Sequence, residues 1–296
     1  MARCIRMTDI QISEAEKTFI IHGIEENFRV DGRNCLEYRY FELETGVVTS
    51  CSGSAHVRQA NTDILVGVKA ELDAPEPTAP KRGRIEFYVD CTANADPEFE
   101  GRGGEELGTA ISTALTQAYR APKCLDLDSL CVVAGRQVWV LYVDVLILEC
   151  GGSLLDAVSV AVKSALYDLR IPKVSVTYDE NGVHEVEVSD DPFDVTSLDV
   201  SSAPCFVTLS KIGQQFVLDA TQGEEVCSVG SLAVAVTETG KIVSLFKGGS
   251  GSLHPENIMD TIEVARDIGI SLNRAIMEKL ELEGTVKEKK TASFLN

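Results

Sequence analysis

The most regular pattern in the chain is an apolar run at Val138–Leu148 that leads through two glycines into a helical pattern. The run is rich in β-branched and aromatic residues, carries one charge at Asp144 and is too short to cross a bilayer. It therefore predicts a strand covered on both faces. The glycines at 151–152 permit a sharp turn, and Ser153 with Asp156 matches a helix capping box. A strand, a glycine turn and a helix start form the usual geometry of a phosphate site, because unpaired amides and the helix dipole point there.

Alternating and short β-rich patterns predict further strands on both sides of this stretch. They are expected at 38–43, 46–51, 53–58, 62–70, 85–91, 130–133, 174–178 and 183–188, and then at 205–211, 215–220, 231–237 and 241–246. Helical spacing predicts a short helix after Ser13, another after Gly104 and a long one from about Pro255. Both parts of the chain thus combine a sheet with helices, which is typical of the α+β fold class.

An acidic break at Ser189–Pro192 separates the two parts and predicts a domain boundary. Residues 1–190 are expected to hold an N-terminal helix and a first domain, and residues 191–284 a second domain. The polar residues 285–296 are predicted to be a disordered tail.

Two short segments carry local positive charge. Arg29 and Arg33 flank an Asp-Gly turn, for which an ordinary solvent-exposed turn is the favoured interpretation. Lys81, Arg82 and Arg84 follow a proline-rich loop and form the densest basic cluster of the first half.

Composition excludes several classes of function. A formal net charge of -19 argues against a free-standing nucleic-acid binder, because that function depends mainly on a basic surface. The nine cysteines include no C-x-x-C pair, and with no recognisable signal peptide they indicate reduced thiols in an intracellular protein. Neither catalytic nucleophile motifs nor His and Cys spacings typical of a metal site are present, so no metal is expected.

Five motifs together resemble one family. They are R-V-D-G-R at 29–33, G-S-A-H-V at 53–57, T-D-I-L-V-G-V-K-A-E at 62–71, P-E-F-E-G-R-G-G at 97–104 and V-D-V-L-I-L-E-C-G-G at 143–152. In this order they resemble the RNase PH family, and more closely its members that form the ring of the RNA exosome. The resemblance extends from about Ser13 to Leu280. It implies two related domains, each of mixed sheet packed with helices.

The resemblance also indicates which catalytic and phosphate-binding residues are missing. Active members carry D-V-L-Q-A-D-G-G-T-R, in which the later aspartate is catalytic and the Thr-Arg pair helps to hold phosphate. Matching the two glycines to 151–152 places Cys150 at the catalytic aspartate and Ser153 and Leu154 at the Thr-Arg pair. The arginine that active members carry on an earlier helix is replaced by Thr109. Phosphorolysis requires a cationic cradle and an acid, which these residues do not supply.

A second alignment stays open. If Asp144 is matched to the first aspartate, Glu149 falls on the catalytic position, but the glycines shift by one and the arginine is still missing. The first alignment is preferred because the glycine turn is the harder constraint.

The resemblance implies a non-catalytic ring subunit of the RNA exosome that needs no cofactor and supports 3′ to 5′ RNA decay and processing by associated nucleases. Expected partners are other RNase PH-like ring subunits, exosome cap proteins, the nucleases, and RNA in the assembled channel, with no membrane. The expected location is the nucleus, nucleolus and cytoplasm. RNA contacts are predicted at Lys81, Arg82, Arg84 and Arg102.

Two alternative functions remain. The first is an active phosphate-dependent 3′ to 5′ exoribonuclease that uses Glu149 or Asp144. The second is a small-molecule enzyme that binds a phosphate-containing ligand at Gly101–Gly104.

Overall fold

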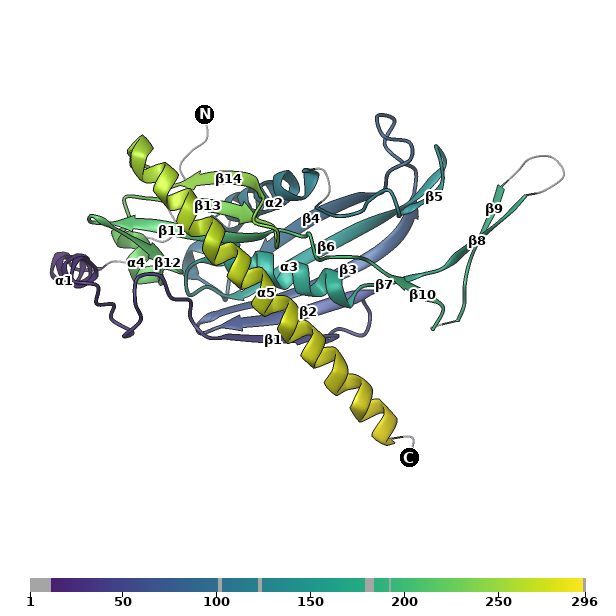
Figure 1. The fold of residues 1–296 in the computed structure, drawn as a ribbon, viewed down its shortest axis with the longest axis horizontal. Helices are drawn as coiled ribbons and strands as arrows, with labels where there is room; N and C mark the ends of the chain where they lie inside the picture. The colour runs from purple at the N-terminus through teal and green to yellow at the C-terminus, as the bar shows by residue number, and fades with distance from the viewer. Residues whose placement is uncertain (1–11, 101–102, 122–123, 179–183, 192, 295–296) are drawn as a thin grey trace.

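A computed structural model of the chain describes residues 12–100, 103–121, 124–178, 184–191 and 193–294. The first sheet has the order β1-β2-β3-β6-β4, and β5 pairs with β6 (Figure 1). Its strands are β1 Phe41–Thr45, β2 Gly53–Gln59, β3 Thr62–Asp73, β4 Arg84–Cys91, β5 Cys131–Val133 and β6 Gln137–Glu149. All pairings are antiparallel except that of β4 with β6. The sheet is therefore mixed, with the predicted apolar run as its long strand β6.

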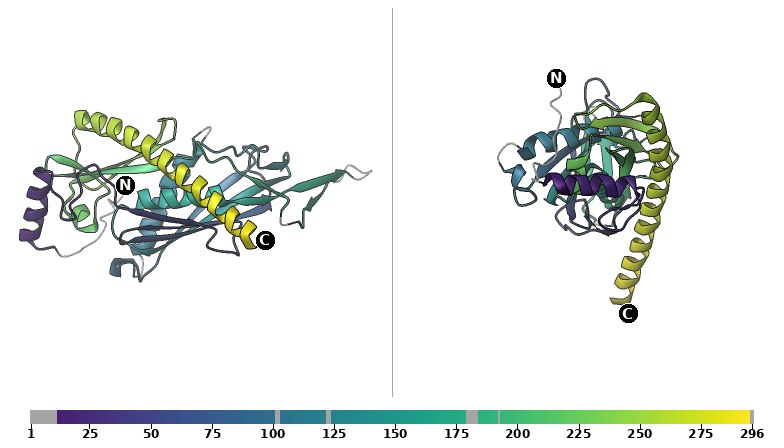
Figure 2. Two further views of the ribbon diagram at one scale, coloured as in Figure 1. Left: turned by 60° about the horizontal axis from the view of Figure 1, so that its bottom comes forward. Right: turned by 90° about the vertical axis from the view of Figure 1, so that its left-hand side faces the viewer.

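The second sheet is a four-stranded antiparallel sheet of order β12-β11-β13-β14. Its strands are β11 Cys205–Ile212, β12 Gln215–Leu218, β13 Gly230–Val236 and β14 Ile242–Gly248. The helix α5, Pro255–Phe294, packs on β11 and β13 and extends beyond the body in Figure 1 and in the right view of Figure 2. Both parts of the chain combine sheet and helices, which confirms the predicted α+β class.

The helix α3, Leu154–Asp168, lies between the two sheets. It contacts β2 and β3 of the first sheet and β11 of the second, so its residues 154–166 are all buried. The helix α2, Gly103–Arg120, packs on β4 with the face that carries Leu107, Ile111 and Leu115. One apolar core therefore runs through both sheets, with α3 at its centre.

Smaller elements complete the fold. They are α1 Glu14–Glu25, the 3-10 turn η1 Pro97–Phe99, β7 Arg170–Pro172, β8 Val174–Tyr178, β9 His184–Val188, β10 Val195–Ser197 and α4 Gln222–Cys227. The strands β8 and β9 form a two-stranded ribbon that projects from the body (Figures 1 and 2).

Two predictions of local structure were wrong, and one helix was missed. Residues 46–51 form a turn, because Gly46 has a φ of +65° that ends β1 and the Val48 amide bonds to the Ser54 hydroxyl. The short helix α4 was not predicted. The expected disordered tail is helical up to Phe294, as an uninterrupted continuation of α5.

Candidate functional site

The glycine turn after β6 lies directly against the second half of the chain. Gly152 has a φ of +97°, and a Cβ placed on it would lie 2.4 Å from the Ala220 carbonyl oxygen. Only glycine fits this approach without strain. The turn therefore forms one site together with the segment Asp219–Glu225, which follows β12.

The amino end of α3 binds a carboxylate of the same chain. The Ser153 N–H donates to Glu225 Oε1 at 2.7 Å. Burial raises the pKa of Glu225 to about 7, although the hydrogen bond from Ser153 acts in the opposite direction. A helix amino end attracts anions through its unpaired amides and its dipole. In this chain the anion is supplied by Glu225.

The capping box predicted from Ser153 and Asp156 is not formed. Ser153 has a left-handed backbone with a φ of 50°, and its side chain makes no capping hydrogen bond. The Asp156 carboxylate instead accepts from the Thr208 N–H at 2.9 Å and hydroxyl at 2.5 Å, and from the Tyr38 hydroxyl at 3.3 Å. Complete burial raises the pKa of Asp156 to about 7. This residue ties α3 to β11 across the two halves of the fold.

The turn between Arg29 and Arg33 is not an ordinary exposed turn. The Arg29 side chain is completely buried and donates to both oxygens of Glu224, with Nε–Oε1 at 2.9 Å and Nη2–Oε2 at 2.6 Å. Arg33 Nη1 donates to Asp219 Oδ2 at 3.0 Å. The turn residues 30–32 are exposed, but the two flanking arginines bind carboxylates nearly 200 positions away, so local sequence did not reveal their role.

Arg39 joins the same network from the segment before β1. It donates to both oxygens of Asp219, at 2.7 and 2.9 Å, and to the carbonyl oxygens of Gly151 and Gly152 at 2.9 and 3.0 Å. The arginines close to the glycine turn are thus paired with internal carboxylates. They do not form an open cationic cradle.

Asp219, Glu224 and Glu225 were not identified from the sequence. One signal was present, because Thr221 and Glu224 have capping-box spacing and form that box at the start of α4. The two glutamates of this short helix bind different partners. Glu224 binds Arg29, whereas Glu225 binds the amino end of α3.

The family positions are only partly brought together. Asp144 is exposed in the middle of β6, between the buried Val143 and Val145, and so lies on the opposite face of the sheet from the helices. Its assignment to the degenerate family site stays a prediction. Glu149 is exposed at the end of β6.

Cys150 and Leu154 also lie at the glycine turn, beside Ser153, and neither carries a charge there. Burial raises the pKa of the Cys150 thiol to about 12, so this group is a neutral thiol at physiological pH. Leu154 is 1% exposed and belongs to the apolar core. Thr109 is exposed on α2, and its hydroxyl donates to the Glu105 carbonyl oxygen.

The residues predicted to contact RNA differ in whether their charge is already paired with a carboxylate. Arg84 pairs with Asp73 and with Glu86. Arg82 is partly exposed beside a hollow lined by aspartates, and Lys81 is exposed. Arg102 lies outside the described residues, as does part of the Gly101–Gly104 segment.

The described part of the chain has neither a metal-binding cluster nor a membrane-spanning helix. Among those residues no group of three or more His, Cys, Asp or Glu side chains could hold a metal ion. Within the same ranges, none of the helices combines the length and the apolarity that spanning a bilayer would need.

Comparison with known proteins defines the class. Models of the 3′ exoribonuclease family match residues 37–172 as domain 1 and residues 202–268 as domain 2. A Dictyostelium discoideum relative, provisionally named exosome complex exonuclease RRP42, is 35% identical over 91% of this chain and 97% of its own length. The exosome complex component Rrp42 of Thermococcus kodakarensis is 35% identical over 88% of this chain and 93% of its own length. The chain belongs to the RNase PH family of 3′ exoribonucleases, which confirms the resemblance.

Solved structures show the same fold. The Archaeoglobus fulgidus exosome with RNA bound to the active site contains a chain that matches with a TM-score of 0.75 and 24% identity. The match covers 88% of this chain and 98% of that one. An archaeal exosome core matches with a TM-score of 0.72 and 23% identity.

Proposed function

We propose that this chain is a non-catalytic subunit of the ring of an RNA exosome. The observation that carries the proposal is the hydrogen bond from the Ser153 amide to Glu225, because it fills the amino end of α3 with an internal carboxylate. A phosphate at this position would have to displace the Glu225 carboxyl from the Ser153 amide, and it would find the apolar Leu154 where active members have an arginine. The names of both relatives support the assignment to an exosome, although the Dictyostelium one is named an exonuclease.

The proposed role is structural. The chain supplies shape and neighbour contacts for 3′ to 5′ RNA decay and processing by associated nucleases. Its partners are other RNase PH-like ring subunits, exosome cap proteins and those nucleases, with RNA passing through the assembled channel. Its proposed location is the nucleus, nucleolus and cytoplasm, which immunofluorescence of the tagged protein would test.

The test of catalysis is incubation of the purified chain with single-stranded RNA and inorganic phosphate. We expect no release of nucleoside diphosphates. Two variants, Glu149→Gln and Asp144→Asn, are the controls. Release that either substitution abolishes would establish the exoribonuclease alternative, whereas release that survives both would indicate a contaminating nuclease.

Assembly is tested by expressing the chain alone and together with RNase PH-like subunits. An acidic chain favours less acidic neighbours, since complementary charge selects partners and suppresses self-association. We expect aggregation or self-association of the chain alone and a soluble complex after co-expression, both measured by sedimentation. A stable monomer that binds none of these subunits would contradict the proposal.

A further inference from the structure

The ribbon of β8 and β9 has one apolar face. In its register Val174 pairs with Val188 and Val176 with Val186, whereas Ser175 pairs with Glu187 between them. Side chains alternate between the two faces of a strand, so the four valines share one face. A two-stranded ribbon is only marginally stable unless its apolar face packs against something.

A groove begins where this face meets the body. It has a volume of about 500 Å³, with Val174 and Val176 from the ribbon on one wall. The other walls include Trp139 of β6, Val132 of β5 and the loop residue Leu198. The groove therefore continues the valine face onto an apolar floor in the body.

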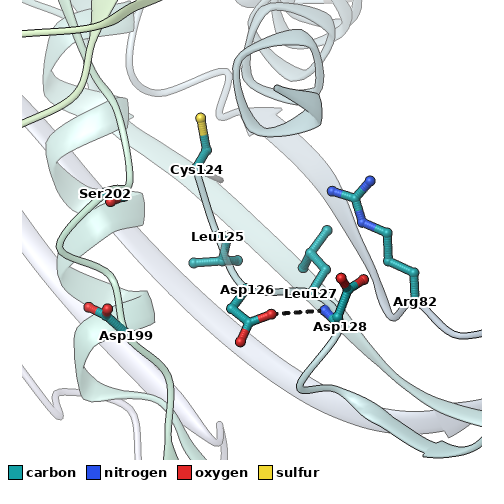
Figure 3. A pocket seen from close by; sticks show the side chains of 8 residues that line it. All are labelled: Arg82, Cys124, Leu125, Asp126, Leu127, Asp128, Asp199 and Ser202. Atoms are coloured by element: carbon teal, nitrogen blue, oxygen red, sulfur yellow. Dashed lines mark hydrogen bonds between the residues drawn. The ribbon is translucent and has the colours of Figure 1, made fainter. Parts of the chain in front are cut away.

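Acidic side chains border the apolar floor. Asp126 and Asp199 line both this groove and an adjoining hollow of about 390 Å³, which Asp128 also lines (Figure 3). Asp126 accepts from the Asp128 N–H at 3.2 Å, and Asp199 accepts from the Ser201 N–H at 3.0 Å. Within the described ranges of the chain, no Lys, Arg or His forms an ion pair with any of these three aspartates.

Nearby basic residues do not neutralise this border. Lys173 lines the groove, but its Nζ pairs with Asp194 Oδ1 at 2.6 Å. Arg82 lies on the side of the adjoining hollow opposite Asp199 (Figure 3). Hydrogen bonds from Ser201, and also the charge of the buried Lys163, lower the pKa of Asp199. In the described part of the chain, the groove thus combines an apolar floor with exposed aspartates that form no direct ion pair.

We propose that this groove binds an extended segment of a partner protein that carries a large apolar side chain next to a Lys or Arg. The apolar side chain packs against Trp139 and Val176, and the cation lies opposite Asp126 and Asp199. RNA is disfavoured because its phosphates would face the aspartates. A second copy of the chain is also disfavoured, since each copy carries a net charge of -19 and the same acidic border.

The test is selection of random peptides displayed on phage against the full chain, purified with a ring subunit if it needs one for solubility. We expect the enriched sequences to pair an apolar residue with a nearby Lys or Arg. Fluorescence polarisation of one enriched peptide then measures its affinity for variants. Val176→Asp should weaken binding by at least about tenfold, as expected for loss of an apolar anchor. Ser175→Asp, which adds the same charge on the opposite face of the same strand, should leave binding unchanged.

The double variant Asp126→Asn and Asp199→Asn should weaken binding and reduce its dependence on salt concentration. Circular dichroism confirms that each variant is folded. The proposal is wrong if the selected peptides lack basic residues, if Val176→Asp binds as well as Ser175→Asp, or if RNA competes with the peptide. A dimer of the chain that Val176→Asp dissociates would assign the groove to a second copy instead. None of these outcomes depends on whether the chain is catalytic.

Discussion

The buried pair of Arg29 and Glu224 permits a quantitative prediction. Their side chains are 0% and 4% exposed, and the pairing is bidentate at 2.6 and 2.9 Å. Arg29→Met removes one partner and leaves the Glu224 carboxylate buried beside a neutral side chain. Breaking a buried pair in this way costs about 3–5 kcal/mol of unfolding free energy. Arg29 also donates to the Leu218 and Asp219 carbonyl oxygens, at 3.0 and 2.9 Å, so further acceptors lose their donor.

Urea unfolding is the assay, followed by circular dichroism and by the fluorescence of the single tryptophan, Trp139, at a chain concentration at which sedimentation detects no aggregate. A loss of this size shifts the urea midpoint down by roughly 1 M or more, given the usual slope of about 1–3 kcal/mol per molar. Glu224→Gln added to Arg29→Met should recover part of the loss, because the unpaired charge is removed.

The control for this prediction is Arg266→Met. Arg266 pairs with Asp267 at the surface, where the two side chains are 46% and 70% exposed, and such pairs contribute about 0–1 kcal/mol. If Arg29→Met and Arg266→Met shift the midpoint equally, the network has no special role in stability. If Glu224→Gln makes the Arg29 variant worse, the buried charge is not the cause of the loss.

Three further predictions concern the site and the surface. Because burial raises the pKa of Glu225 to about 7 from an ordinary value of 4.5, the folded state binds its proton more tightly. Its contribution to stability should therefore fall as pH rises from about 4.5 to 7, and Glu225→Gln should flatten that part of the stability profile. Gly152→Ala should destabilise the chain by more than about 1 kcal/mol in thermal unfolding, whereas Gly135→Ala, at a φ of +77° with nothing near its Cβ position, should cost less. Charge reversal of Lys81 and Arg82 should weaken RNA crosslinking to the assembled ring and its salt dependence, and unchanged crosslinking would mean that both residues are merely solvated.

Patterns of hydrophobicity predicted most of the fold because the elements are long and locally consistent. The strands β6, β11 and β13 and the helices α3 and α5 were all predicted from apolar runs, hydrophobic periodicity and local capping or turn residues. The same periodicity predicts that Asp144 is exposed, because it alternates with valines that are buried. The helical tail was missed because a polar composition was taken as disorder, although no proline interrupts residues 285–294.

The candidate site was less predictable because its groups come from distant parts of the chain. Ser153 and Asp156 have the spacing of a capping box, but each has a stronger partner in the second half, Glu225 and Thr208 respectively. These tertiary hydrogen bonds form in place of the local capping box. The strand, glycine turn and helix start indicated phosphate-site geometry, and the family resemblance predicted that the chemistry is missing. Neither contained information about Glu225, which binds the Ser153 amide.

The long sequence separation between the partners of the arginine network delays their pairing while the chain is being synthesised. Arg39 is 180 residues away from its partner Asp219. At about 5–20 residues per second, the ribosome needs roughly 9–36 s to make the chain between them. Throughout this interval the arginines between α1 and β1 have been synthesised, but the carboxylates that bind them have not. Until α4 has left the ribosome, the new N-terminal segment therefore lacks the partners that bury Ile24 and Cys35 in the folded chain, which include Ile212 and Val217. Cells that make this protein have reason to protect that segment with a chaperone during synthesis.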